Sequence, residues 1–374
     1  MSAAATIRSV ATCVPAPRRQ QDLWEGFFRE HFRDVKWAER IYRSAGPVQR
    51  HPAVDPTAED ISRWTTEARM RRYLVEAMPL AKGAASRALS DGGSKASDVG
   101  LLAVVSCTGY STPGLDIFLA RDLGLPADAE RLAFGHMGCH AALPALGIVS
   151  DWVSRRQRPA LLVSVELSSL HLQPRQAGDA GGAPPDEVLA HALFSDAAAA
   201  ALIAPGNVPN GAGSSQGVLT GATPGLELVA LEASTDFASA CEITWEITGT
   251  GFRMGLGRTV PQVVGAHVGP TVERLLGRCG LRRDDVSAWG AHPGGTAILD
   301  AVAKALCLSP ADMAPSRLVL EQSGNCSSAT ILLVLQEVVR SRRLEPGDHV
   351  VLLGFGPGLT IYAALLSVSG PAPD

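Results

Sequence analysis

The chain has 374 residues, 46% of them hydrophobic and 19% charged, and a formal net charge of −4, which is typical of an ordinary soluble globular protein. The negative charge argues against a nucleic-acid-binding face, and no apolar run approaches the roughly 18 residues of a membrane span. The seven cysteines have no metal-ligand spacing and the N-terminus resembles no signal peptide, so we expect a cytoplasmic protein without a metal site.

The first half of the chain alternates short apolar segments with helical ones, a pattern typical of an α/β fold. Val99–Cys107 is predicted to be a buried strand, and the segment from Cys139 to about Arg155 is predicted to be helical. Two further buried strands are expected at Pro159–Glu166 and Ala197–Ala204. Pro205–Gly217 is rich in turn-forming residues, which indicates a boundary or a surface loop.

The second half of the chain repeats this order. A strand is predicted at Val286–His292, followed by a glycine-led helix over Ser323–Val339. Two more strands are predicted at Asp348–Gly356 and Leu359–Val368. The elements of the second half therefore correspond in kind and order to those of the first.

The spacing of particular residues supports a duplication. Gly109 and Gly294 end predicted strands 185 residues apart, and Cys139 and Asn325 begin predicted helices 186 residues apart. We therefore predict two similar halves, residues 1–210 and 211–374, although chance likeness between two α/β patterns is the alternative. If the halves pack about a pseudo-two-fold axis, both helix N-termini approach its centre and bring Cys139, Asn325 and His292 into one pocket.

Two interpretations of Cys139 remain open on the local sequence alone. A free cysteine commonly serves as a small core hydrophobe. A cysteine at a helix N-terminus beside an imidazolium has a pKa lowered to roughly 3.5–7.5 and acts as a nucleophile.

Four sequence motifs indicate which protein family the chain resembles. "GHMGCHAA", "AHPGGTAIL", "SGNCSSAT" and "GFGPGLT" resemble, in order and spacing, the motifs of type III polyketide synthases, the chalcone synthase-like family. The resemblance implies a thiolase-like fold with duplicated halves in α-β-α-β-α layers. It also implies a homodimer that condenses acyl-CoA and malonyl-CoA substrates without a metal or redox cofactor.

The resemblance also assigns roles to particular residues. Cys139 is expected to carry the acyl chain as a thioester, while His292 and Asn325 donate hydrogen bonds to the enolate oxygen formed from malonyl-CoA. Phe194 and Phe252 match gatekeeping phenylalanines, and Arg40 matches a position that contacts CoA phosphates. The segment expected to shape the cyclisation cavity comprises Gly354, Phe355, Gly356, Pro357 and Gly358.

The predicted cavity wall departs from the plant enzymes at three positions. Cys107 and His171 stand where plant members carry Thr, and Thr112 stands where they carry Met. The smaller Thr112 favours an aliphatic starter over malonyl or aromatic ones, and His171 adds a titratable group. The longer segment Arg175–His191 is predicted to be a loop at the edge of the active site.

Two alternatives belong to other functional classes. One is a ketosynthase of the fatty-acid-initiation type that performs a single condensation. The other is a non-catalytic subunit that stabilises a partner, which the retention of Cys139, His292 and Asn325 disfavours. The sequence specifies neither the starter, the number of extensions nor the ring closure.

Overall fold

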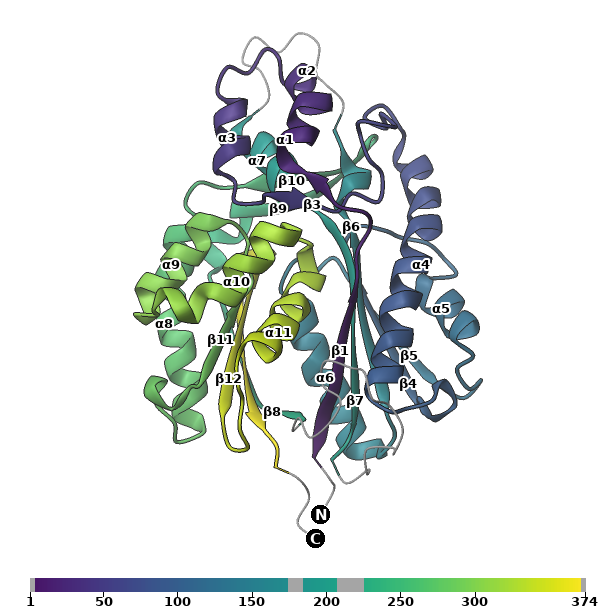
Figure 1. The fold of residues 1–374 in the computed structure, drawn as a ribbon, viewed down its shortest axis with the longest axis vertical. Coiled ribbons are helices and arrows are strands. Elements are labelled where there is room, and N and C mark those ends of the chain that lie inside the picture. The colour runs from purple at the N-terminus through teal and green to yellow at the C-terminus, as the bar shows by residue number, and fades with distance from the viewer. Residues whose placement is uncertain (1–3, 174–183, 207–224, 371–374) are drawn as a thin grey trace.

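A computed structural model describes residues 4–173, 184–206 and 225–370. Within these ranges the strands fall into two sets that occupy the two halves of the chain (Figure 1). The N-terminal set comprises β1 (Ala5–Cys13), β4 (Leu101–Ser106), β5 (Glu130–Gly135), β6 (Ala160–Leu167) and β7 (Asp196–Pro205). The C-terminal set comprises β8 (Leu226–Thr235), β11 (Ala288–Ala291), β12 (His349–Gly356) and β13 (Thr360–Val368).

Four strands of each set follow corresponding orders, as the duplicated fold implies, and β5 has no counterpart in the C-terminal set. The N-terminal strands run β1-β7-β6-β4-β5 and the C-terminal strands run β8-β13-β12-β11. They meet where β1 pairs antiparallel with β8 over Thr6–Glu227 and Ile7–Leu226. The predicted boundary at residue 210 lies outside the described residues, as does most of the predicted loop Pro205–Gly217.

Helices cover the strands in layers (Figure 1). In the figure, α4 and α5 flank the N-terminal strands, α8 and α9 flank the C-terminal strands, and α6 and α11 lie between the two sets. This is the α-β-α-β-α layering that the resemblance implied. The bounds of these helices are α4 Thr66–Asp91, α5 Leu115–Leu123, α6 Ala142–Arg156, α8 Val260–Arg278, α9 Thr296–Leu306, α10 Pro310–Ser323 and α11 Thr330–Ser341.

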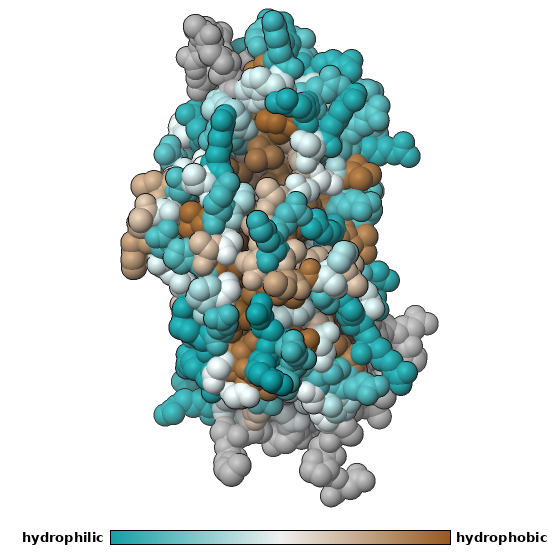
Figure 2. Space-filling model, turned by 90° about the vertical axis from the view of Figure 1, so that its left-hand side faces the viewer, coloured by the Kyte–Doolittle hydropathy of each residue, from teal (hydrophilic) through white to brown (hydrophobic). Residues whose placement is uncertain are grey.

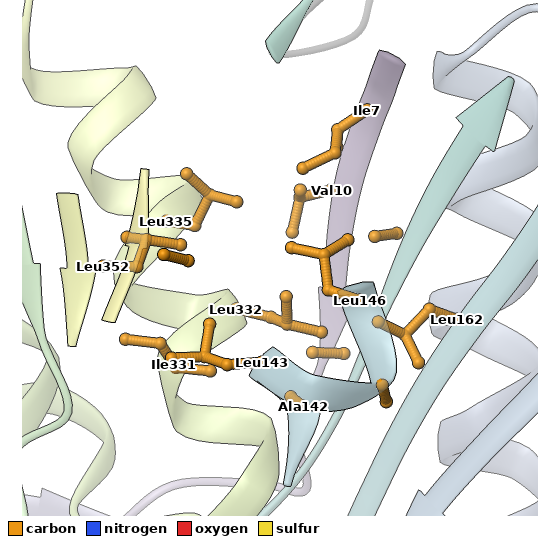
Figure 3. Close-up of a cluster of buried hydrophobic side chains, with 14 of the residues drawn as sticks. Ile7, Val10, Ala142, Leu143, Leu146, Leu162, Ile331, Leu332, Leu335 and Leu352 are labelled. Atoms are coloured by element: carbon orange, nitrogen blue, oxygen red, sulfur yellow. The ribbon is translucent and has the colours of Figure 1, made fainter. Parts of the chain in front are cut away.

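The central layer holds the hydrophobic core that joins the halves. Leu143 and Leu146 of α6 pack in one buried cluster with Ile331 and Leu332 of α11 (Figure 3). All four side chains are fully buried. Because full burial of such a side chain contributes roughly 1.5–3 kcal/mol, this cluster is a principal reason that α6 and α11 lie together.

Strand β7 begins with a run of alanines. Ala197–Ala201 would be a poor strand-forming run in isolation. Here α4 packs on one face of β7 and α6 on the other, and the run is fully buried. Small side chains allow both helices to approach, so tertiary burial overrides propensity, and the predicted strand Ala197–Ala204 is confirmed.

The predicted central helices begin later than expected. Helix α6 begins at Ala142 rather than at Cys139, which places Pro144 in its first turn, where proline is tolerated. Helix α11 begins at Thr330, and Asn325 precedes it in an isolated bridge with Phe194. Cys139 and Asn325 therefore lie in turns that precede α6 and α11.

A cap of short elements covers the upper end of the strands (Figure 1). It contains β2 (Arg18–Arg19), α1 (Gln20–Leu23), a π-helical turn (Trp24–Phe28), α2 (Arg29–His31), α3 (Ala38–Ser44), β3 (Gln49–Arg50), α7 (Pro185–Leu193), β9 (Ile243–Thr248) and β10 (Gly251–Leu256). The prediction of a loop over Arg175–His191 is wrong for Pro185–His191, because these residues belong to α7. Residues 175–183 lie outside the described ranges. Figure 2 shows a hollow with hydrophobic atoms at its floor near this end.

Short 3-10 segments connect the larger elements. They are η2 (Ala96–Asp98), η3 (Ser168–His171), η4 (Phe237–Glu242), η5 (Arg283–Asp285), η6 (Ser327–Ala329) and η7 (Pro357–Leu359). Among the described residues, no helix has the length and apolar character required to cross a bilayer.

The two glycine-rich motifs pack directly on each other. Gly138 has φ +78°, and a Cβ there would lie 2.1 Å from Cδ of Pro357. A Cβ on Gly356 would lie 2.3 Å from Nδ1 of His140. The glycines thus permit close contact between the loop that holds Cys139 and the segment Gly354–Gly358.

We predict that Gly138→Ala lowers the free energy of unfolding by about 2–4 kcal/mol, because it combines left-handed backbone strain with overpacking against Pro357. Gly124→Ala is the matched control, since Gly124 has φ +73° and no atom lies within 4 Å of the place that a Cβ would take there. The control is expected to cost only about 1–2 kcal/mol. Urea unfolding of both variants measures the difference, and equal losses would contradict a tight contact between the loops.

Candidate active site

Cys139 lies in the turn between β5 and α6. His136 has φ +57° and Gly138 has φ +78°, so the chain reverses sharply before the cysteine. Cys139 is 8% exposed, and the side chains of Ser327 and Asn325 lie close enough to its sulfur to lower the pKa of the thiol. The structure therefore confirms that the turns ahead of α6 and α11 meet.

The amide of Asn325 is held in a fixed orientation. Its backbone N–H donates to the Leu193 carbonyl and its carbonyl accepts from the Ser195 N–H, each at 2.9 Å. Its side-chain Oδ1 accepts from the Ser327 N–H at 2.9 Å. Because Oδ1 is committed in this way, the amide nitrogen is the group directed to Cys139. Asn325 does not cap α11, whose N-cap residue is Ala329.

His292 ends β11 in the same region. It is 1% exposed, and its backbone N–H donates to the Leu353 carbonyl at 2.8 Å. Neither ring nitrogen has a hydrogen-bond partner among the described residues. The next residue of β12, Gly354, lies against His140, and His140 contributes to the lowered pKa of His292. His292 thus lies within electrostatic reach of the residue that follows Cys139.

Burial dominates the ionisation of these groups. It raises the pKa of Cys139 to about 12, against the lowering effect of the hydrogen bonds from Ser327 and Asn325. Burial, with a smaller contribution from His140, lowers the pKa of His292 to about 3. The expected lowering of the thiol pKa is therefore wrong for the resting site, because α6 begins three residues later and His292 is neutral.

Glu166 is a buried carboxylate that sequence reasoning missed. It accepts hydrogen bonds from the Cys107 N–H at 3.0 Å and from the Thr108 hydroxyl at 2.8 Å, and the Ser328 hydroxyl also donates to it. Burial raises its pKa, and its charge raises that of Cys139. The available sequence signal was an acidic residue at the end of the predicted buried strand Pro159–Glu166.

Cys107 and Thr112 lie in different surroundings in the protomer. The Cys107 sulfur accepts a hydrogen bond from the Gly138 N–H at 3.1 Å, so it supports the loop of the nucleophile. Thr112 is exposed on the protomer surface, where its hydroxyl donates to that of Tyr110 at 3.1 Å. The preference for an aliphatic starter stays a prediction.

His171 closes the space beside Phe252. Its Nδ1 accepts from the Phe252 N–H at 3.0 Å, so Nε2 carries the proton and donates to the Thr108 carbonyl at 2.8 Å. The imidazole stacks on the Phe252 ring at 4.4 Å between centroids. Burial lowers the pKa of His171 to about 3, so this imidazole is a neutral structural wall.

The gatekeeper residues share a cavity. Phe194, Phe252 and His171 line one cavity together with Trp245 of β9. Phe355 of the segment Gly354–Gly358 is buried in the core that contains α8 and α9. Arg40 lies exposed on α3, away from the residues that line this cavity. The described residues contain no cluster of three or more metal-binding side chains.

The layered, duplicated architecture defines a protein of the thiolase-like class. The N-terminal domain of chalcone and stilbene synthases matches residues 48–207, and their C-terminal domain matches residues 231–369. The chain belongs to the chalcone and stilbene synthase family, the type III polyketide synthases, and is an acyl-transferring condensing enzyme.

Individual relatives support this assignment. A 1,3,6,8-tetrahydroxynaphthalene synthase of Streptomyces peucetius subsp. caesius is 34% identical, covering 96% of this chain and 92% of the relative. The Mycobacterium tuberculosis alpha-pyrone synthesis polyketide synthase-like Pks18 is 30% identical, covering 97% and 91%. The crystal structure of the tetrahydroxynaphthalene synthase of Streptomyces coelicolor A3(2) has a TM-score of 0.85 at 26% identity, covering 98% and 100%.

We predict that His292→Ala slows alkylation of Cys139 by iodoacetamide at least tenfold at pH 7. A thiol whose pKa is about 12 needs a proton acceptor to react at this pH, and His292 is the buried base proposed for that role. Peptide mass spectrometry follows each cysteine separately, and the exposed Cys241 is the internal control. An unchanged rate at Cys139 would remove His292 as its proton acceptor.

Proposed function

We propose that Cys139 takes an acyl group from an acyl-CoA and that His292 and Asn325 drive its extension with malonyl-CoA. The observation that carries this proposal is the approach of the turns ahead of α6 and α11, which brings Ser327 and Asn325 close enough to Cys139 to affect the pKa of its thiol. The two unpartnered ring nitrogens of His292 support it, because a buried polar group needs a partner and a thioester oxygen supplies one.

Acyl loading begins with proton transfer from Cys139 to His292. The thiolate attacks the thioester carbonyl of the acyl-CoA, and the carbon–sulfur bond to CoA breaks with its electron pair. The CoA thiolate leaves and recovers the proton from the His292 imidazolium. Neutral His292 thus serves first as general base and then as general acid, and the acyl group remains on Cys139.

Extension begins when malonyl-CoA loses carbon dioxide. The electron pair of the broken carbon–carbon bond forms an enolate whose oxygen accepts hydrogen bonds from His292 and Asn325. The enolate carbon then attacks the Cys139 thioester, and the Cys139 thiolate leaves. The product is a β-keto thioester on CoA, and its return to Cys139 permits another extension. This cycle uses no metal or redox cofactor.

Cyclisation completes the proposed reaction. The names of the relatives describe a tetrahydroxynaphthalene and an alpha-pyrone, both of them cyclic products. We therefore propose a pyrone or resorcinol-type ring for this chain. The segment Gly354–Gly358 supports this role, because its glycines fix its backbone against the loop of Cys139.

We further propose that the protein is a homodimer. Strand β5 pairs with β4 on one side and is an edge strand among the described residues. Its residues are mostly exposed, including Leu132 at 36%. An open edge with an exposed apolar side chain favours pairing with a second strand. The neighbouring loop supplies two more exposed residues, Tyr110 and Thr112.

We predict that light scattering at micromolar concentration gives about twice the 39.1 kDa chain mass. Leu132→Lys is expected to shift the protein to monomer, because it places a charge on the proposed edge. Val75→Lys, at a side chain that is 65% exposed on α4, is the control and keeps the dimer. A monomeric wild-type protein would overturn the proposal.

We predict that Cys139→Ala abolishes polyketide formation but retains measurable decarboxylation of malonyl-CoA. Decarboxylation depends on the two enolate donors, whereas condensation needs the thioester. Release of radiolabelled carbon dioxide measures decarboxylation, and the mass of the product measures condensation. The control variant Cys241→Ala is expected to retain both activities. Wild-type products with two or more added two-carbon units exclude the single-condensation alternative. Product formation by Cys139→Ala at the wild-type rate would refute the assignment of Cys139 as the nucleophile.

A further inference from the structure

Asn325 follows a short turn at the end of α10. Helix α10 ends at Ser323, and Gly324, which has φ +69°, leads from it into Asn325. A Cβ on Gly324 would lie 2.9 Å from the Leu193 carbonyl oxygen, so the turn passes close to the end of α7. The orientation of the Asn325 amide therefore depends on the contacts that fix this turn on either side.

His51 contacts both sides of the turn. Its backbone N–H donates to the Ser195 hydroxyl oxygen at 2.7 Å, and the Ser195 N–H in turn donates to the Asn325 carbonyl at 2.9 Å. Its ring nitrogen Nε2 lies 3.0 Å from the carbonyl oxygen of Gln322, three residues before Asn325. His51 directly follows β3 and is only 6% exposed, so these contacts lie in the interior.

Both ring nitrogens of His51 face carbonyl oxygens. Nδ1 lies 2.8 Å from the Pro15 carbonyl oxygen, and Nε2 lies 3.0 Å from that of Gln322. A carbonyl oxygen only accepts hydrogen bonds, and a neutral imidazole has one N–H donor, whereas an imidazolium has two. Only the imidazolium satisfies both contacts, because a neutral ring places a lone pair against one of the two oxygens.

The charged groups near His51 act on its ring in opposite directions. The buried guanidinium of Arg50, the preceding residue, opposes an imidazolium. The carboxylate of Asp196, which accepts from the Ala53 N–H at 2.7 Å, favours one. Burial raises the pKa of Asp196 to about 6, so this favourable charge develops as the pH rises. Other charged or titratable groups on the adjoining described elements are the exposed Glu321, the Arg18–Asp55 ion pair and the buried, neutral thiol of Cys326.

We propose that His51 is a positioning residue whose imidazolium holds the turn of Asn325, so that enolate formation slows when His51 loses its proton. This inference rests on the proposed function, because it assumes that the Asn325 amide donates to the enolate oxygen. Loss of the proton leaves the carbonyl of Pro15 or of Gln322 without its donor. The fixed geometry that a donor to a developing oxyanion requires is then relaxed.

The other contacts of this turn limit the effect to its alignment. The Gln49 side-chain amide also donates to the Gln322 carbonyl at 3.0 Å, and the Val48 N–H donates to the Glu321 carbonyl at 2.8 Å. These bonds keep the end of α10 attached to the cap when His51 is neutral. Deprotonation is therefore expected to lower the rate of decarboxylation without unfolding the cap.

The Cys139→Ala protein isolates the step, because decarboxylation of malonyl-CoA does not need the thiol. Burial lowers the pKa of His292 to about 3, so His292 stays neutral throughout the test. We expect kcat for release of radiolabelled carbon dioxide to fall at least about threefold from about pH 5 to about pH 8, with KM little changed. Ionisation of Asp196 acts in the opposite direction, so the sign separates the two groups. A flat or rising profile overturns the inference.

His51→Gln, made in the Cys139→Ala protein, assigns the profile to this residue. Glutamine keeps a donor but has no charge to lose, so we expect a low rate at every pH that matches the parent at its alkaline end. His267→Gln removes a partly exposed histidine from α8 and is expected to keep the parent profile. A profile that persists unchanged in the His51 variant overturns the role of His51.

Gln49→Met tests the turn without changing His51 and decides the question if His51→Gln does not fold. It removes the second donor to the Gln322 carbonyl, so the turn depends more strongly on the imidazolium. We expect the ratio of the acid to the alkaline rate to rise at least about twofold, and an unchanged ratio overturns the inference. If Cys139→Ala releases no carbon dioxide at any pH, the proposed function fails. If it does so with a profile that neither variant alters, this inference alone fails.

Discussion

The packing of α6 against α11 is the contact on which the remaining structure depends. These helices lie between the two strand sets, and their side chains pack in a core built from both halves. Their positions determine where the preceding turns meet, which brings Cys139 to the amide of Asn325. Close packing between the glycine motifs then fixes the separation of the loops to within the size of a single carbon atom.

The centre that results is polar but carries little net charge in its resting state. Burial favours the neutral forms of Cys139 and His292, and Asn325 and Ser327 contribute hydrogen bonds rather than charges. Such a site stabilises charge when it forms on the substrate, because fixed donors in a dry pocket need no reorganisation.

The sequence predicted the elements whose patterns are local. Continuous apolar runs located β4, β6 and β7, and the repeated spacing located Cys139 and Asn325 as a pair. The sequence did not predict the role of Glu166. The apolar pattern of its strand indicates burial, but it does not indicate that groups of Cys107 and Thr108 donate hydrogen bonds to the carboxylate. It also misjudged the thiol pKa, since the balance between a helix N-terminus and desolvation depends on where the helix begins and on what covers the site.

The bridge between Phe194 and Asn325 has a consequence for how such an enzyme diversifies. This bridge joins Phe194, the proposed gatekeeper, to Asn325, the proposed donor to the enolate. If these proposed roles hold, a backbone shift at Phe194 also displaces the Asn325 amide, so natural variation is constrained to alter substrate range by other routes. Side chains that line a cavity beside Phe194 without joining this bridge, such as Val54 and Ile61, are free to change. Substrate selectivity should therefore vary through side chains of the cap, while the bridge between Phe194 and Asn325 stays unchanged.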